Sequence, residues 1–99
     1  MLNISKESEN GKVCLALEGR LDTITSPQLE KEIQGCLEGA TELTLDFEKL
    51  EYISSAGLRV LLSAQRVMNR QGPMKVTHVN TVIREIFEVT GFQDILTIE

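Results

Sequence analysis

The sequence has few of the side chains from which most catalytic and metal sites are built. It has one histidine, His78, and two cysteines, Cys14 and Cys36, which stand 22 positions apart and form no CxxC pair. This spacing fits no common zinc motif, so we expect no metal site. We expect both cysteines to be reduced thiols in the core, and His78 to be a hydrogen-bonded residue at a strand end.

The sequence also lacks the short motifs that bind nucleotides or expose a nucleophile. It contains no Walker loop, no GxGxxG and no GxSxG, each of which builds its site at a turn between a strand and a helix. We therefore expect no cofactor and no catalytic residue.

The sequence also lacks an excess of basic charge and any long apolar segment. Ten Lys and Arg face fifteen Asp and Glu, a net charge of −5, whereas a nucleic-acid partner calls for a basic surface. No apolar run approaches the roughly 20 residues needed to span a bilayer. The first nine residues lack the apolar stretch of a signal peptide. We expect no nucleic-acid partner, no direct membrane insertion and a cytoplasmic location.

What the sequence does contain is typical of one small folded domain. Its 99 residues are 41% hydrophobic and 25% charged, which is ordinary for a globular protein. With no Trp and 4% aromatic residues, the core must be mainly aliphatic. We expect residues 1–99 to form a single domain.

Hydrophobic periodicity divides the chain into five strands and three helices. The expected strands are 2–8, 12–18, 43–47, 74–79 and 95–98. The expected helices begin at Ser26, Gly57 and Asn80 and end at Gly39, Gln71 and Gly91, with Ser26 and Asn80 as caps. Their expected apolar faces are Leu29, Ile33, Cys36 and Leu37; Gly57, Val60, Leu61, Ala64, Val67 and Met68; and Val82, Ile83, Ile86 and Val89.

This order predicts an α/β fold with a mixed, mostly parallel five-stranded sheet. Strands that alternate with helices pair in parallel through right-handed crossovers. Glu9-Asn10-Gly11 is a hairpin turn, which adds an antiparallel N-terminal strand. Strands 12–18 and 43–47 alternate apolar and polar residues more cleanly than a sheet covered on both faces would. We therefore expect the helices to crowd on one face.

Two serines, Ser54 and Ser55, follow a strand and open the most regular helix. One interpretation is N-capping. The other is an anion site, because a helix N-terminus favours negative charge and phosphorylation of a serine adds about −1.5 to −2 charges. Ala56 and Gly57 keep the turn small, so that a partner could approach closely.

The segment 19–26 is the second candidate region, with Asp22, Thr23 and Thr25 between a strand and a helix. If strands two and three are parallel neighbours, this loop lies beside Ser55, at the sheet edge where ligand sites collect. The alternative is a plain connecting loop. Arg59, Arg66 and Arg70 share a face of the second helix, which is either solvated or binds a partner.

Three segments in register resemble the anti-sigma factor antagonist family, the STAS domain. They are Leu17–Asp22, Leu43–Phe47 and Tyr52–Leu62, and the resemblance covers nearly the whole chain. It implies a protein that turns nothing over and binds an anti-sigma factor, often a serine-protein kinase, which then releases a sigma factor. In this family the kinase phosphorylates a serine or threonine at the start of the second long helix, and a phosphatase reverses the reaction.

Carried over to this sequence, the resemblance makes Ser55 the phosphoacceptor. Ser54 stands where the family often has an aspartate, and it is the second candidate. Asp22 matches an acidic position of the first loop, and Asp46 matches a structural one. The partner-binding residues implied are Asp22, Thr23, Thr25, Ser54, Ser55, Ala56, Gly57 and Arg59.

Two alternatives remain open at this point. The first is a STAS adaptor of a membrane transport or sensory complex that is never phosphorylated. The second is a small hydrolase with Ser55 as nucleophile, which requires His78 within hydrogen-bond reach of Ser55.

Overall fold

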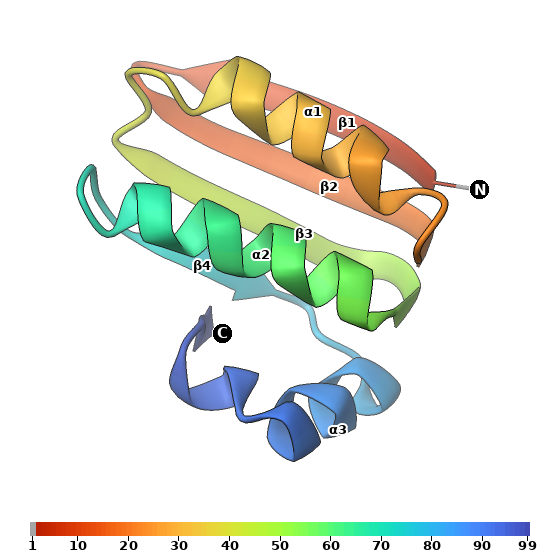
Figure 1. Ribbon diagram of the computed structural model, residues 1–99. Coiled ribbons are helices and arrows are strands. Elements are labelled where there is room, and N and C mark those ends of the chain that lie inside the picture. Colours follow the sequence, from red (N-terminus) through yellow and green to blue (C-terminus); the bar gives the residue numbers. More distant parts are fainter. Residues whose placement is uncertain (1) are drawn as a thin grey trace.

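The computed structural model describes residues 2–99, which form one five-stranded sheet and three α-helices (Figure 1). The elements are β1 (Leu2–Glu9), β2 (Lys12–Leu21), α1 (Ser26–Cys36), β3 (Glu42–Ile53), α2 (Ser55–Met68), β4 (Met74–Thr77), α3 (Thr81–Thr90), a 3-10 turn η1 (Phe92–Asp94) and β5 (Thr97–Ile98). The strands lie in the order β1-β2-β3-β4-β5. β1 pairs with β2 antiparallel and every other pair is parallel. The predicted α/β fold is confirmed.

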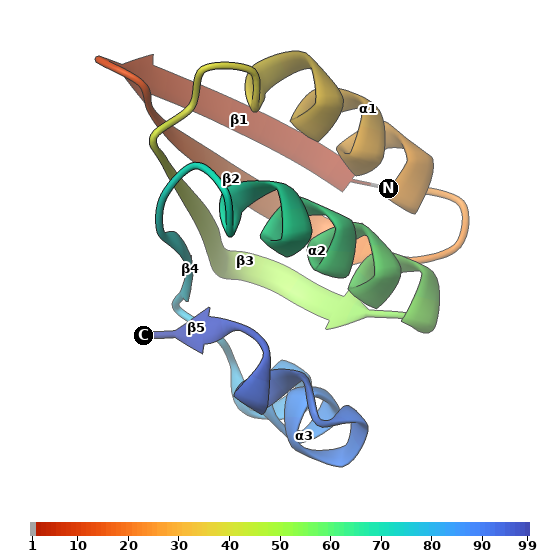
Figure 2. The same cartoon turned by 60° about the vertical axis from the view of Figure 1, so that its left-hand side comes forward.

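The helices cover one face of the sheet, as the alternation predicted. α1 and α2 lie side by side on the same face in both views (Figures 1 and 2). Leu15 and Leu45, neighbours on β2 and β3, are fully buried beneath them. α3 packs against β3, where the rings of Phe87 and Phe47 lie 6.4 Å apart. Residues of opposite parity, such as Thr44, are only half buried, so the other face of the sheet is open to solvent.

The first helix begins and ends differently from the prediction. Its N-cap residue is Thr25, whose side chain makes no capping bond. The predicted cap, Ser26, is the first helical residue, and its hydroxyl donates to the Asp22 carbonyl instead. The helix ends at Cys36, and Gly39, with φ +79°, makes the turn into β3. The capping prediction was wrong because Asp22 folds the preceding loop, as described below.

Some residues assigned to the apolar helix faces are exposed. Val67 on α2 is 41% exposed, and Val82 and Val89 on α3 are 54% and 87% exposed. Of the predicted α3 face, Ile83 is buried as expected, and the second buried residue is Phe87, four residues later on the same stripe, which was not predicted. The α3 sequence is apolar over more of its circumference than the sheet can cover, so periodicity alone could not separate Ile83 from the exposed Val82 and Val89.

The strand ends also differ from the prediction. β4 stops at Thr77 because His78 has φ +56°, outside the extended region. β5 is only Thr97–Ile98, because the chain after Gly91 first forms η1. β2 and β3 are longer than predicted. Two register shifts between them, after Ala16 and after Gly19, give β3 extra residues and let the pairing continue to Leu21 and Ile53.

Gly57 sits where α2 packs closest to the sheet. A Cβ at this position would lie 2.8 Å from side-chain carbons of both Ile53 and Leu21. We predict that Gly57→Ala destabilises the protein in urea denaturation, because overpacking costs about 1–3 kcal/mol and outweighs the gain in helix propensity of about 1 kcal/mol. Gly35→Ala on α1 is the matched control, since nothing lies within 4 Å of that position, and it should stabilise. Equal stabilisation by both variants would contradict the close packing of α2.

Candidate functional site

The carboxyl ends of β2 and β3 bring the two predicted regions together. Leu21 pairs with Ile53 in the last register position, and the Ser54 backbone N–H donates to the Leu21 carbonyl at 2.8 Å. The β2–α1 loop and the β3–α2 turn therefore lie side by side, at the right-hand end of the sheet in Figure 1. The predicted neighbourhood of the Asp22 loop and Ser55 is confirmed.

The two serines of the turn have different surroundings. Ser54 is the N-cap of α2: it has extended backbone angles, it is half buried, and its Oγ accepts a 3.4 Å bond from the Gly57 backbone N–H. Ser55 is the first helical residue and is exposed. Within residues 2–99 its hydroxyl makes no hydrogen bond. The capping interpretation therefore applies to Ser54, and Ser55 presents a free hydroxyl.

Asp22 orders the loop beside this turn. Its Oδ1 accepts bonds of 3.0 Å from the backbone N–H groups of both Ile24 and Thr25. The buried Thr25 hydroxyl donates to the Arg20 carbonyl at 2.8 Å and accepts from the Asp22 backbone N–H at 2.9 Å. The Thr25 N–H is the main cause that lowers the pKa of Asp22, partly opposed by desolvation. Asp22 and Thr25 give the loop a fixed shape.

This network makes a prediction for the pH dependence of the loop. Because the pKa of Asp22 is lowered in the folded state, its bonds should be complete above the ordinary value of 3.8 and lost as the pH falls through the lower folded value. We expect the amide NMR signals of Ile24 and Thr25 to shift together below pH 3.8. Asp22→Asn keeps the accepting oxygen and should abolish this titration without loss of fold. A transition above pH 3.8 would contradict the assigned network.

The fixed loop exposes an apolar residue that the sequence analysis missed. Ile24 is 87% exposed, although it lies between Thr23 and Thr25 in a loop whose backbone is held by hydrogen bonds. The available signal was a lone β-branched apolar residue in an otherwise polar segment, two positions after the loop aspartate. Its exposure depends on the Asp22 bonds, which no periodicity encodes.

A shallow groove runs between α1 and α2 beside the turn. It holds about 360 Å³. It is lined by Thr23, Ser26, Pro27, Glu30, Ala56, Arg59, Val60 and Ser63.

Of the predicted partner-binding residues, Thr23, Ser55 and Arg59 are exposed, and Ala56 is half buried at the groove wall. Gly57 and Thr25 are buried beneath this surface. We call the surface of Thr23, Ile24, Ser55, Ala56 and Arg59 the docking face.

The geometry excludes a Ser55–His78 pair. His78 Nδ1 lies 3.0 Å from Asp46 Oδ1, which confirms that the ring has a partner. Asp46 stands seven residues before Ile53 on β3, a separation of roughly 20 Å at the rise of a strand. The hydrolase alternative therefore fails its geometric requirement.

The same region contains a group with metal-binding potential that the sequence analysis did not anticipate. One ligand atom each of Asp46, Glu48 and His78 lies within 4.8 Å of the others. Asp46 Oδ1 already accepts from His78 and from the Glu48 backbone N–H. The group is far from the docking face, and these hydrogen bonds account for the closeness of its three residues without an ion.

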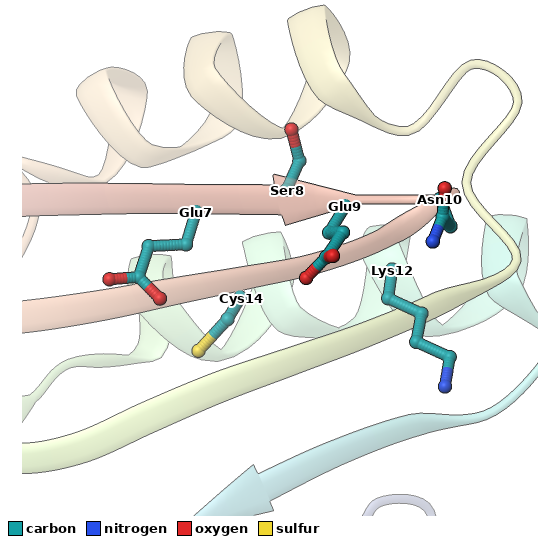
Figure 3. A pocket seen from close by; sticks show the side chains of 6 residues that line it. All are labelled: Glu7, Ser8, Glu9, Asn10, Lys12 and Cys14. Carbon is teal, nitrogen blue, oxygen red and sulfur yellow. The ribbon is translucent and has the colours of Figure 1, made fainter.

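A second hollow, of about 660 Å³, lies beside the β1–β2 hairpin, at the other end of β2 from Asp22. It is lined by Glu7, Ser8, Glu9, Asn10, Lys12 and Cys14 (Figure 3). Its acidic and basic side chains are exposed. Burial raises the pKa of the Cys14 thiol, helped by Asp46 and Glu7, which disfavours the reactive thiolate. Cys14 and Cys36 are free, as expected, but half buried.

Comparison with known proteins agrees with this architecture. A family model described as "Mlab, STAS domain" matches residues 4–97. The chain belongs to the STAS domain family. BtrV of Bordetella bronchiseptica, which bears the name of an anti-sigma factor antagonist, is 32% identical to this STAS domain over 99 residues, covering 98% of this chain and 85% of BtrV.

Two solved structures share the fold of this STAS domain. An anti-sigma factor antagonist from Mycobacterium paratuberculosis superposes with a TM-score of 0.90 at 20% identity, covering 99% of this chain and 85% of that one. The Bacillus cell fate determinant SpoIIAA in its phosphorylated form gives a TM-score of 0.75 at 20% identity, covering 98% and 91%. None of the helices within residues 2–99 has the length and apolarity to cross a membrane.

Proposed function

We propose that this STAS domain is an anti-sigma factor antagonist, which binds a kinase-type anti-sigma factor through the docking face. The observation that carries the proposal is the free, exposed Ser55 hydroxyl beside a rigid loop and a groove. The names of BtrV and of the Mycobacterium structure support the same function. The cytoplasm is the compartment in which such an antagonist would act.

Phosphorylation of Ser55 is the proposed switch. The γ-phosphoryl group of ATP held by the partner kinase is transferred to Ser55 Oγ, ADP leaves, and the hydroxyl proton passes to a base on the kinase. A serine phosphatase restores the hydroxyl. That the SpoIIAA structure is a phosphorylated form supports this step.

The surroundings of the two serines favour Ser55 over Ser54 as the acceptor. A kinase needs an accessible hydroxyl, and Ser54 is half buried with its oxygen committed to the Gly57 N–H. A phosphoryl group on Ser54 would disturb the cap of α2. On Ser55 it would stand at the positive end of the helix dipole, which tolerates an anion, so the fold should persist.

A displacement assay tests the function directly. Each kinase-type anti-sigma factor encoded in the source genome is purified in complex with a fluorescently labelled sigma factor, and this protein is added. We expect release of labelled sigma factor from one complex. If the protein binds none of these complexes and releases no sigma factor, the antagonist function is wrong. Binding without any phosphorylation would instead favour the adaptor of a transport or sensory complex.

A further inference from the structure

Arg59 lies four residues after Ser55 on α2, and both side chains are exposed. Residues at this spacing are neighbours on a helix surface. Helical side chains lean toward the N-terminus, so a long side chain covers the turn that precedes it. From this position the Arg59 guanidinium can reach the turn that presents the Ser55 hydroxyl.

Arg59 has no competing carboxylate on its own helix. The segment Ser55–Met68 contains neither Asp nor Glu. Across the groove, Glu30 lines the same hollow, yet within residues 2–99 no carboxylate comes within 4.0 Å of the Arg59 guanidinium. The positive charge nearest to Ser55 along the helix is thus available.

We propose that Arg59 holds the phosphoryl group of phosphorylated Ser55 in an intrahelical ion pair. This inference rests on the proposed function for the phosphoryl group itself. An anion followed four residues later by a cation is the favourable orientation on a helix. One modification then changes the docking face twice: it adds a dianion at Ser55, and it withdraws the charge of Arg59 from the partner.

The pairing can be tested without the kinase. Phosphoserine is incorporated at position 55 during expression through an expanded genetic code, and the second ionisation of the phosphate is followed by ³¹P NMR against pH. The ion pair favours the dianion, so its pKa should be lower by roughly 0.3 units with Arg59 present than in the Arg59→Gln variant. Arg59→Lys should restore part of the shift, and added salt should reduce it.

Arg66→Gln is the matched control, because Arg66 is also exposed on α2 but lies eleven residues from Ser55. Its titration should coincide with that of the unsubstituted protein. Coincident titrations of the Arg59→Gln and unsubstituted proteins would overturn the pairing. A failure of the kinase to modify Ser55 would count against the proposed function instead, and would leave the NMR result standing.

Discussion

A phosphoryl group on Ser55 should weaken binding to the anti-sigma factor at least about 30-fold and leave the fold intact. The partner surface that accepts a neutral hydroxyl would have to desolvate a dianion that Arg59 on the same helix neutralises only in part, and the uncompensated charge that remains costs about 2–5 kcal/mol at an interface. The measurement is isothermal titration of the partner with unmodified protein and with protein carrying phosphoserine 55. Ser55→Asp carries less charge and should give a smaller loss.

Alanine variants of the two serines form a matched pair. Ser54→Ala removes the cap of α2 and should cost about 0.5–2 kcal/mol of stability in urea denaturation, with Ser55 still a kinase substrate. Ser55 caps nothing, so Ser55→Ala should change stability by less than about 0.5 kcal/mol, bind the partner normally and resist phosphorylation. The reverse pattern would show that the roles of the two serines are exchanged.

Replacing Ile24 should produce the second large effect. The loop holds this apolar side chain in water, and its burial against a partner would contribute about 1.5–3 kcal/mol. We therefore expect Ile24→Ser to weaken binding about 10- to 100-fold, with no loss of stability, because the side chain contributes nothing to the core. Isothermal titration and urea denaturation measure the two quantities separately.

Val89→Ser is the control for surface hydrophobicity. Val89 is also 87% exposed, but it lies on α3 (Figure 2), a helix that contributes no residue to the docking face. This variant should bind the anti-sigma factor as the unsubstituted protein does. Equal losses from both variants would mean that general surface hydrophobicity, and not the docking face, governs the interaction.

The sequence predicted the sheet well because its strands have one buried face. Val13, Leu15 and Leu17 alternate with half-buried or exposed neighbours. This alternation predicts both the strand and the face of the strand that the helices cover. From the parallel pairing of β2 and β3 it followed that the Asp22 loop would lie beside Ser55. That inference needed only the direction of two strands.

Features that depend on local geometry were not predictable in this way. Which serine caps α2 is decided by the backbone angles of Ser54, and the exposure of Ile24 is decided by the Asp22 hydrogen bonds. On α3, periodicity could not distinguish Val89 from Phe87, because only one stripe of an extensively apolar helix meets the sheet. Asp46 and His78 are far apart in sequence and come together only through the pairing of β3 with β4.

Mapping the phosphate tests the central claim most directly. The purified protein is incubated with its partner kinase and MgATP, digested and analysed by tandem mass spectrometry, with the Ser54→Ala and Ser55→Ala variants alongside. We predict one phosphate on Ser55 in the unsubstituted and Ser54→Ala proteins, and none in Ser55→Ala. Phosphate on Ser54 alone, or no phosphate on either serine while the partner still binds, would contradict a switch at Ser55.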